Sequence, residues 1–331
     1  MTGIITSRDR KVLVTGATGF IGRHLCAYLL DYGFSVRALI RHKKLADFNF
    51  GEKFEQCFGD ILDSDFLASA CEEVDVIVHL AGSPHVINAN DKHILKTTVI
   101  GTEQLLTAAV NQKVQRFVFM SSSLASKENL DRIFDSAYGR AKFAAEQSVM
   151  SHHKKGNIDC VVLRPVNVYG RGMRGNIAKL INLVSRRLAP PLPHLETLIS
   201  LIGIEDVCEA TRLAITSEEA CGKTYTLTDG IQYVINDIEK AIYREFGRKV
   251  PKWRMPITLL YYLCLWLENL TKFLNFFGFR AALFGSLGIR TYNNLVEDNL
   301  YKNEKIKEEL GFNPKTTFYC ALPEIVDSLK G

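Results

Sequence analysis

The sequence predicts an α/β protein, with a doubly wound parallel sheet and a smaller, mostly helical C-terminal lobe. Short runs in the first half are apolar throughout, as strands buried on both faces of a sheet are. Stretches with helical spacing separate these runs. A glycine-rich turn joins the first run to the first helical stretch. Because crossovers between parallel strands are right-handed, this alternation gives a sheet with helices on both faces.

The strands and helices are expected to alternate along the chain. Strands are predicted over residues 11–15, 34–40, 74–80, 116–121 and 159–163. Helices are predicted over residues 21–32, 102–111, 138–150 and, between two loops rich in glycine or proline, 176–188. The short runs 199–203 and 224–227 are expected to be strands that return to the main sheet. The sheet domain is thus predicted over residues 10–170, with later strands near 199–228, and the lobe over 171–331.

The composition is that of an ordinary globular protein. With 331 residues the chain has room for about two domains. Hydrophobic residues make up 47% and charged residues 23%, which excludes intrinsic disorder, collagen-like repeats and a coiled coil. The formal net charge of +5 is too small to favour nucleic acid, whose binding needs a clustered basic face. A small anionic ligand fits this charge.

Eight cysteines are spread along the chain, at positions 26, 57, 71, 160, 208, 221, 264 and 320. They form no C-x-x-C pair and no tight cluster with histidine, so a zinc site is not predicted. Their mostly apolar neighbours indicate reduced, buried thiols, as in cytosolic proteins. The first ten residues are polar and charged, without the apolar core of a secretory signal. We therefore expect a cytoplasmic protein without a metal.

The turn after the first predicted strand has the composition of a phosphate-binding loop. Residues 15–22 read TGATGFIG and open a helix. Gly16 would allow the tight turn, Gly19 would let the backbone approach a pyrophosphate, and Gly22 would let helix and strand pack closely. The helix N-terminus adds free N–H groups and a partial positive charge for the phosphates.

A series of motifs resembles, in the same order, those of the extended short-chain dehydrogenase/reductases, also called the NAD-dependent epimerase/dehydratase family. The G-x-x-G-x-x-G spacing of the turn is the first of them. The others are Gly59-Asp60-Ile61, which resembles the family's loop after its third strand, His79-Leu80-Ala81-Gly82, Val99-Ile100-Gly101-Thr102, Ser121-Ser122-Ser123, Tyr138-Gly139-Arg140-Ala141-Lys142, the run 164–170 (RPVNVYG) and Ile204-Glu205-Asp206-Val207. Together they cover residues 11 to about 210. Thr98 departs from the family pattern, which has asparagine there.

The resemblance implies a Rossmann-type fold and an enzyme that uses NAD or NADP. It implies that the catalytic residues are Ser123, Tyr138 and Lys142, with Ser122 as the alternative to Ser123. The cofactor-binding residues that it implies, together with those of the glycine turn, are Gly16, Thr18, Gly19, Phe20, Ile21, Gly22, Asp60, Ile61, Leu80, Ala81, Gly82, Thr98, Tyr138, Lys142, Pro165 and Val168.

The spacing of Tyr138 and Lys142 has a physical reason. Residues four apart lie on one face of a helix, so the ammonium would lie beside the phenol. That charge favours the phenolate and would lower the pKa of Tyr138 below its ordinary value of about 10. Tyr138 would then exchange a proton with a substrate hydroxyl or carbonyl, while Ser123 hydrogen-bonds the same oxygen. The nicotinamide would carry out the hydride chemistry.

Basic residues at the end of the second predicted strand favour NADP over NAD. In NAD-dependent proteins an acid at this position accepts hydrogen bonds from the ribose hydroxyls. This chain has Arg41 there, with Arg37 before it and His42, Lys43 and Lys44 after it. A basic cluster pairs with a 2′-phosphate instead.

Residues that follow the catalytic serines in the sequence limit the class of reaction that the chain could carry out. Related dehydratases carry an Asp-Glu pair where this chain has Leu124 and Ala125, so dehydration is not expected. The segment 187–206 is similar to bacterial members that act on UDP-N-acetylhexosamines or their 4-keto forms. We therefore expect NADPH-dependent reduction of a 4-keto UDP-sugar. The substrate-binding residues implied are Ser123, Asn167, Arg171 and Arg187, with Arg174 as a further candidate for the diphosphate.

Three other functions stay open at this point. A UDP-sugar 4-epimerase would hold its cofactor tightly and recycle it. A 3β-hydroxysteroid or dihydroflavonol-type reductase would act on an apolar substrate. A binding protein that senses NADP without turnover would have no need of the serine, tyrosine and lysine.

The run 257–267 (ITLLYYLCLWL) is strongly apolar, but Glu268, Asn269 and Lys272 end it before the roughly 18 residues that span a membrane. It predicts either a lobe helix buried against the main domain or a dimer partner, or a membrane-surface or substrate-entry helix anchored by Trp266 and nearby phenylalanines. In the second case, peripheral membrane contact would run through residues 256–280. The family resemblance also implies a homodimer built from two helices of the sheet domain.

Overall fold

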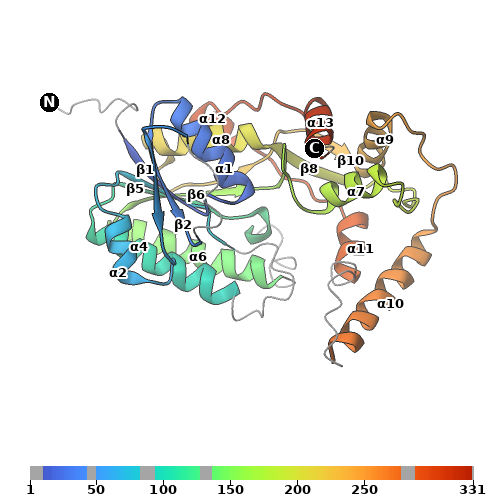
Figure 1. Cartoon of the computed structure of the whole chain (residues 1–331), viewed down its shortest axis with the longest axis horizontal. Coiled ribbons are helices and arrows are strands. Elements are labelled where there is room, and N and C mark those ends of the chain that lie inside the picture. The colour runs from blue at the N-terminus through green and yellow to red at the C-terminus, as the bar shows by residue number, and fades with distance from the viewer. Residues whose placement is uncertain (1–9, 43–49, 83–93, 127–135, 277–287, 330–331) are drawn as a thin grey trace. The chain divides into compact units, whose positions relative to one another are not determined.

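The computed structural model describes residues 10–42, 50–82, 94–126, 136–276 and 288–329 (Figure 1). The chain divides into two compact units. Unit 1 consists of Met1–Val168, Ile202–Thr228 and Lys302–Lys315, and unit 2 consists of Tyr169–Leu201, Asp229–Tyr301 and Thr316–Gly331. The chain therefore passes between the units more than once.

Unit 1 is built on a seven-stranded parallel sheet with the strand order β3-β2-β1-β4-β5-β6-β9. Its strands are β1 (Lys11–Thr15), β2 (Ser35–Ile40), β3 (Phe54–Phe58), β4 (Val76–His79), β5 (Arg116–Met120), β6 (Asp159–Pro165) and β9 (Thr224–Leu227). Strands β1, β4, β5 and β6, in the interior of the sheet, are almost wholly buried, as their apolar runs predict. The strand order reverses between β1 and β4, which is where ligands bind in open α/β sheets.

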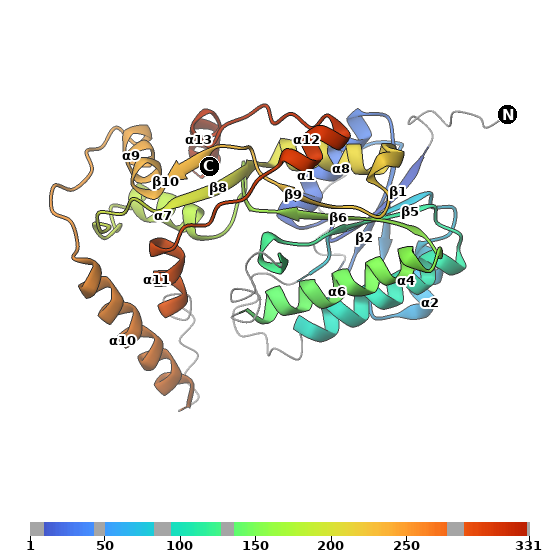
Figure 2. The same cartoon turned by 180° about the vertical axis from the view of Figure 1, so that it is seen from behind.

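Helices cover both faces of this sheet (Figures 1 and 2). Helices α1 (Phe20–Asp31) and α8 (Ile204–Thr216) pack together on one face. Helices α2 (Ser64–Ala70), α4 (Gly101–Asn111) and α6 (Ala137–Lys154) pack as neighbours on the other. Between this second layer and the sheet lies a large apolar core, which includes Leu13, Ile77, Leu105, Phe117 and Val162. The doubly wound architecture predicted from the sequence is thus confirmed.

A second, small sheet has the order β10-β8-β7, and the boundary between the two units falls within β7 and β8. The strands of this sheet are β7 (Asn167–Tyr169), β8 (Leu198–Gly203) and β10 (Gln232–Val234). The helices of unit 2 are α7 (Asn176–Ser185), α9 (Ile235–Glu245), α10 (Ile257–Phe276), α11 (Ile289–Val296) and α13 (Phe318–Asp327). Asp229 ties this unit together, because its carboxylate accepts hydrogen bonds from the hydroxyls of Tyr233 (2.7 Å) and Tyr169 (3.1 Å). Phe318 packs edge-on against the rings of both tyrosines.

The two strands predicted over residues 199–203 and 224–227 lie in different sheets. As expected, β9 pairs with β6 and extends the main sheet. The expectation for residues 199–203 was wrong, because β8 joins the small sheet and pairs antiparallel with β10. The backbone of Asn299 completes β8's hydrogen bonding by donating to the Leu198 carbonyl and accepting from the Ser200 N–H. The segment Lys302–Lys315, which carries α12 (Glu304–Leu310), belongs to unit 1, and the sequence did not predict this.

All eight cysteines lie in described residues and all are free thiols. Five are buried, as expected, but Cys320 is exposed on α13. Among the helices of the described residues, none is long and apolar enough to cross a membrane.

Candidate active site

The glycine turn between β1 and α1 forms a cradle that side chains would fill. Gly16 has a φ of +70°, and a Cβ there would lie 2.9 Å from the backbone nitrogen of Ala81. A Cβ on Gly22 would lie 2.3 Å from the Gly16 carbonyl oxygen. In the described structure, α1 begins at Phe20 with no side-chain cap and no acidic residue in its first turn. Its N–H groups and dipole therefore suit an anion, so the residues present fit the diphosphate of a dinucleotide.

Gly82, Tyr138 and Lys142 meet beside the end of β4. A Cβ placed on Gly82 would lie 3.3 Å from Lys142 Nζ and 4.0 Å from Tyr138 Cε2. Tyr138 and Lys142 stand one turn apart on α6, and Gly82 follows β4 by three residues. The predicted tyrosine–lysine pair and the predicted cofactor-binding strand end are therefore brought together.

Lys142 is almost completely buried, with 1% of its surface exposed. Its Nζ donates to the backbone carbonyl of Met120 (2.7 Å) and lies 4.5 Å from the centre of the Phe119 ring. Burial lowers the pKa of Lys142 to about 7, although the carboxylate of Glu146 opposes the shift. Near neutral pH, the Lys142 amine is therefore poised to gain or lose a proton.

Tyr138 departs from the sequence-based expectation. Burial raises the pKa of its phenol above the ordinary value, and no neighbouring charge opposes this shift. The expected lowering by Lys142 was wrong, because the lysine Nζ is engaged with Met120 and lies 6.0 Å from the phenol ring centre. Tyr138 is thus protonated at neutral pH, which suits a proton donor.

The three serines after β5 have different surroundings. Ser122 caps the short 3-10 turn η4 (Ser123–Ala125), because its hydroxyl accepts from the Leu124 N–H at 3.2 Å. Ser121 is buried, and its hydroxyl has no partner among the described residues. Ser123 is also buried and begins the turn. Because the Ser122 hydroxyl is engaged as a cap, Ser123 stays the catalytic candidate.

Helix α6 is fixed at two points on either side of the tyrosine–lysine pair. Ser136 caps its N-terminus by accepting from the Gly139 N–H at 3.2 Å. One turn beyond Lys142, the buried carboxylate of Glu146 accepts two hydrogen bonds from the Arg164 guanidinium of β6, at 2.9 and 2.6 Å. Such a bidentate pair holds a helix in one position along a strand.

A buried polar network, which sequence reasoning missed, underlies the site. His79 Nδ1 lies 2.6 Å from the hydroxyl of Thr15, and its Nε2 lies 3.0 Å from the hydroxyl of Thr102. Thr102 donates its own proton to the Thr98 carbonyl, so His79 must donate to it through Nε2. Burial, helped by the charge of Lys142, lowers the pKa of His79 well below the ordinary value, so the ring is neutral and its Nδ1 accepts from the Thr15 hydroxyl. Parallel pairing of β1 with β4 places Thr15 beside His79, and this pairing could have indicated the network.

This network holds up the strand ends that face the site. The hydroxyl of Thr15 also accepts from the backbone N–H of Ala81 at 3.2 Å, and the Leu80 N–H donates to the Thr15 carbonyl. Thr98 lies in a π-helical turn, η3 (Lys96–Ile100), directly before α4. Its hydroxyl oxygen is buried and has no partner among the described residues.

The remaining predicted cofactor residues lie at or near strand ends of unit 1. Asp60 is exposed after β3, and its carboxylate accepts from the Leu62 N–H at 2.9 Å. Ile61 is buried, and a Cβ on Gly101 would lie 3.1 Å from its Cγ2. Pro165 ends β6 in a buried position, and Val168 lies half-buried in β7. Thr18, Phe20 and Ile21 belong to the glycine turn and the first turn of α1.

The basic cluster after β2 is smaller than expected. Arg41 and His42 are exposed, whereas Lys43 and Lys44 lie outside the described residues. Arg37 does not belong to the cluster. Its side chain is buried, donates to the carbonyls of Ala70 (2.9 Å) and Glu72 (2.7 Å), and lies 3.0 Å from a carboxylate oxygen of Glu55. Arg37 therefore joins β2 to its neighbours, and we remove it from the proposed phosphate site.

The predicted substrate residues other than Ser123 are spread over both units. Asn167 is exposed at the start of β7 and belongs to unit 1. Arg171, Arg174 and Arg187 are exposed in unit 2, and Arg187 adopts a left-handed backbone with a φ of 62°. Their part in substrate binding stays a prediction.

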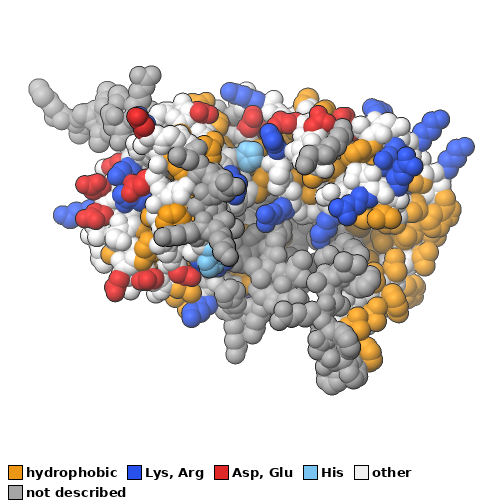
Figure 3. Space-filling model, in the orientation of Figure 1, with side chains coloured by type: hydrophobic (Ala, Val, Ile, Leu, Met, Phe, Trp, Pro, Cys, Tyr) orange, Lys and Arg blue, Asp and Glu red, His pale blue; other side chains and the backbone are white. Residues whose placement is uncertain are grey.

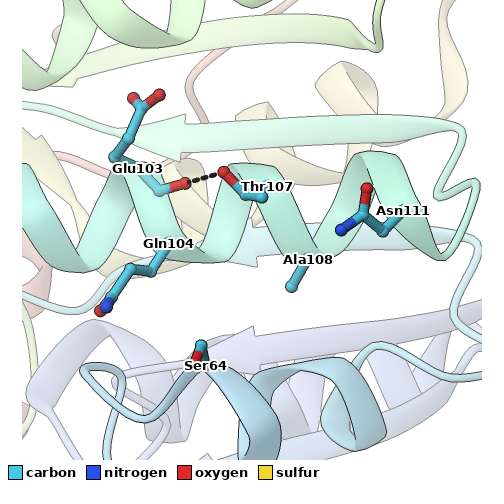
Figure 4. A pocket seen from close by; sticks show the side chains of 6 residues that line it. All are labelled: Ser64, Glu103, Gln104, Thr107, Ala108 and Asn111. Atoms are coloured by element: carbon cyan, nitrogen blue, oxygen red, sulfur yellow. Dashed lines mark hydrogen bonds between the residues drawn. The ribbon is translucent and has the colours of Figure 1, made fainter.

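Two other polar features lie apart from this site. A shallow pocket between α2 and α4 is lined by Ser64, Glu103, Gln104, Thr107, Ala108 and Asn111, none of which is a predicted site residue (Figure 4). Asp159, Glu218 and Cys221 bring three potential metal ligands together. The guanidinium of Arg116 already lies among them, 3.1 Å from Glu218 and 3.0 Å from Cys221 Sγ, so a cation is present without a metal.

Known proteins resemble the chain in sequence and in fold. Residues 12–227 match the model of the NAD dependent epimerase/dehydratase family. A UDP-glucose 4-epimerase of Vibrio cholerae is 28% identical over 77% of this chain and 82% of its own length. A 3 beta-hydroxysteroid dehydrogenase/Delta 5-->4-isomerase of Mycobacterium tuberculosis is 27% identical over 97% of this chain and 90% of its own. The crystal structure of a Thermotoga maritima UDP-glucose 4-epimerase with UDP-glucose superimposes with a TM-score of 0.73 at 20% identity, covering 97% of this chain and 98% of that one. The family match spans the glycine turn, the serines and the tyrosine–lysine pair, and the chain belongs to the NAD-dependent epimerase/dehydratase family.

Proposed function

We propose that this chain is an NADP-dependent reductase of a ring ketone in which Tyr138 is the proton donor. One observation carries the proposal: Gly82, Tyr138 and Lys142 meet beside the end of β4, and the backbone that precedes Gly82 borders the glycine turn. A side chain on Gly82 would enter the space beside the lysine ammonium and the phenol. Absence of a side chain there leaves room for a flat ligand against these two groups.

The chain's own residues would manage the proton and the oxygen. A nicotinamide bound beside Gly82 would supply hydride to the carbonyl carbon. Tyr138, which is protonated at neutral pH, would give its proton to the carbonyl oxygen, so that the ketone becomes a secondary alcohol. Ser123 would donate a hydrogen bond to the same oxygen and orient it. The phenolate that remains would regain a proton before the next turnover, and Lys142, whose Nζ lies beside Gly82, would border the bound cofactor.

NADP is favoured over NAD by the residue that follows β2. Arg41 is exposed there, at the position where NAD-dependent relatives of this fold place an acid. A guanidinium pairs with a phosphate dianion in bidentate geometry and cannot accept from a ribose hydroxyl.

A 4-keto UDP-sugar is the substrate that we propose first. The similarity to a UDP-glucose 4-epimerase supports it. Arg171 and Arg187 are exposed and offer charge for a diphosphate. Dehydration is disfavoured by Leu124 and Ala125, which lie in the turn after the serines and carry no acid.

An apolar ring ketone, such as a steroid, is the second candidate. The similarity to a steroid dehydrogenase extends over 97% of this chain. It therefore includes unit 2 as well as the unit that contains the main sheet. Helix α10 of that unit exposes many apolar side chains, which would suit an apolar substrate.

The experiment is an NADPH-consumption assay with a panel of ketones. The panel contains 4-keto forms of UDP-, dTDP- and GDP-sugars and 3-ketosteroids, and each reaction is repeated with NADH. We expect consumption of NADPH with the 4-keto UDP-sugar and a product with one new hydroxyl. Turnover of the steroids alone would shift the assignment to the second candidate. Cofactor retained through purification, with interconversion of UDP-sugars and no net consumption, would identify a 4-epimerase. Saturable NADPH binding without turnover of any ketone would contradict the proposal and favour a sensing protein.

A further inference from the structure

Helix α10 presents a continuous apolar stripe to the outside of unit 2. Leu259, Tyr262, Leu263, Trp266 and Phe273 follow each other at intervals that place them on one helix face. Tyr262, Trp266 and Phe273 are 65%, 59% and 60% exposed, which is unusual for side chains of this size. Figure 3 shows hydrophobic side chains gathered along the edge where α10 lies in Figure 1. An apolar patch of this kind marks a docking surface.

The opposite side of α10 is packed, so the stripe has a fixed direction within its unit. Cys264 and Leu267 are buried, and the Tyr261 ring contacts that of Tyr292 on α11 at 5.2 Å between centres. The Glu268 carboxylate accepts from the Ile289 N–H at 3.0 Å, at the start of α11. This glutamate is the one acidic residue of α10, and it is thus engaged inside the unit.

Several basic residues precede the apolar stripe in the sequence. The segment 246–276 contains one acidic residue, Glu268, and five basic residues, Arg248, Lys249, Lys252, Arg254 and Lys272. Arg254 pairs with the buried Glu239, and Arg248 donates to the Val184 carbonyl. Lys249 and Lys252 are exposed, and the neighbouring Trp253 is 59% exposed. One end of the stripe therefore carries positive charge and an aromatic side chain.

We propose that Lys249, Lys252, Trp253 and the exposed stripe of α10, together the α10 surface, dock on an anionic phospholipid bilayer. Leucine and phenylalanine side chains would enter the boundary of the acyl chains, while tryptophan and tyrosine rings prefer the headgroup level. The lysines would attract acidic headgroups. The helix would lie in the plane of the surface, because no helix in the described parts of the chain is able to span a bilayer.

Charge decides between a bilayer and a second copy of the chain. In two copies that met through this face, the α10 surface of one copy would offer no acidic complement to the lysines of the other, since Glu268 is turned inward to α11. A charge that leaves water at an interface without an opposite partner costs free energy. An anionic bilayer supplies the missing complement and accepts the apolar stripe at the same time.

The two tryptophans allow a direct test, because the chain contains no others and both belong to the α10 surface. Tryptophan emission of the full-length protein is recorded with vesicles of phosphatidylcholine alone and of phosphatidylcholine with phosphatidylserine. Binding is measured in parallel by co-sedimentation. We expect a blue shift and co-sedimentation with the anionic vesicles, and both effects should weaken as salt screens the lysines.

Variants separate the apolar from the electrostatic contribution. Trp266→Glu with Phe273→Glu should weaken co-sedimentation at least about tenfold, since the bilayer loses two large apolar side chains. Lys249→Glu with Lys252→Glu should weaken it on anionic vesicles only. Leu329→Glu, a change of another exposed apolar side chain of unit 2, should leave binding unchanged. Thermal melting checks that each variant is folded, and Phe273→Glu alone replaces the first pair if that pair fails to fold.

Three results would overturn the proposal. The first is no blue shift and no co-sedimentation with either vesicle. The second is equal binding to both kinds of vesicle, which would show that acidic headgroups do not contribute to docking. The third is a wild-type dimer in sedimentation that Phe273→Glu dissociates, without any vesicle binding, which would assign the α10 surface to a second copy. None of these readouts depends on catalytic activity, so their failure is distinguishable from failure of the proposed function.

Discussion

The strand ends of unit 1 and helix α10 of unit 2 break the usual rule of burial in opposite directions. At the strand ends, a lysine, a histidine and several hydroxyl groups lie inside, where apolar side chains would be ordinary. On α10, tryptophan, tyrosine, leucine and phenylalanine lie outside, where polar side chains would be ordinary. Each region thus holds the side chains that the other would be expected to have.

The difference shows two ways in which a fold carries a function at a cost. Burial of Lys142 and His79 costs free energy of desolvation, which hydrogen bonds to Met120, Thr15 and Thr102 offset. Exposure of the α10 stripe leaves apolar surface in water, which the proposed docking on a bilayer would offset. Contacts within the chain thus offset the cost in the first region, whereas a partner would offset it in the second.

The largest effect is expected at the phenol of the buried site. Tyr138→Phe removes the proton donor but keeps the ring, so turnover should fall by about 10²–10⁴-fold. Affinity for NADPH should change little, because the ring still fills its place beside Gly82. Steady-state kinetics and a cofactor titration measure the two quantities. Tyr32→Phe, which changes an exposed tyrosine at the end of α1, is the matched control. Full turnover in Tyr138→Phe would remove this residue from the mechanism.

Burial of Lys142 predicts a dependence of stability on alkaline pH. Its pKa is about 7 in the folded chain and 10.5 as the ordinary value. Between these values the unfolded chain binds more protons, so this group makes wild-type stability rise as pH rises from 7 to 10.5. Lys142→Met should lose that rise, which amounts to about 3–5 kcal/mol at about 1.4 kcal/mol per pKa unit. Denaturant unfolding at several pH values measures the difference, and parallel profiles for the two proteins would show that Lys142 has its ordinary pKa.

The histidine network predicts a dependence of the same sign at acidic pH, since burial lowers the pKa of His79 as well. His79→Phe keeps the ring volume but leaves the hydroxyls of Thr15 and Thr102 without their partner, so stability at pH 7 should fall by about 2–4 kcal/mol. Below pH 6.5, the ordinary pKa of histidine, the unfolded wild type takes up a proton that the folded ring refuses. The wild type therefore loses stability there and the gap to the variant narrows. A gap that stays constant from pH 7 to pH 5 would mean that His79 titrates normally in the fold.

The smallest effect is expected at the cofactor's 2′-phosphate. Arg41→Ala should weaken NADPH binding about tenfold, the size of one lost charge-assisted contact, and leave NADH binding unchanged. Isothermal titration with both cofactors measures the ratio. Lys53→Ala, an exposed basic residue before β3, serves as the control. An equal loss for NADPH and NADH would exclude a phosphate contact by Arg41.

Much of unit 1 is predictable because its signals are local. The glycine turn follows β1 directly, and the central strands are apolar throughout because both faces of the sheet are covered. The i and i+4 spacing of Tyr138 and Lys142 likewise places both on one face of α6.

The incorrect predictions concern partners that a sequence does not specify. The run LISLIG of β8 has the same character as a strand of the main sheet, and only pairing with β10 decides its place. Arg37 and Arg41 are close in sequence, but Arg37 bonds to carbonyls at the end of α2. The pKa of Tyr138 depends on where the Lys142 Nζ is directed, which spacing alone does not determine. The α10 run fits a buried and an exposed helix equally well until its packing on α11 is known.

A titration of the wild-type chain with NADPH, followed by the fluorescence of the reduced nicotinamide, tests the central claim about the buried site most directly. The account predicts saturable binding of one NADPH per chain, with enhanced emission as the nicotinamide enters the space beside Gly82, and weaker binding of NADH. A folded protein that shows no saturable binding of either cofactor would contradict it.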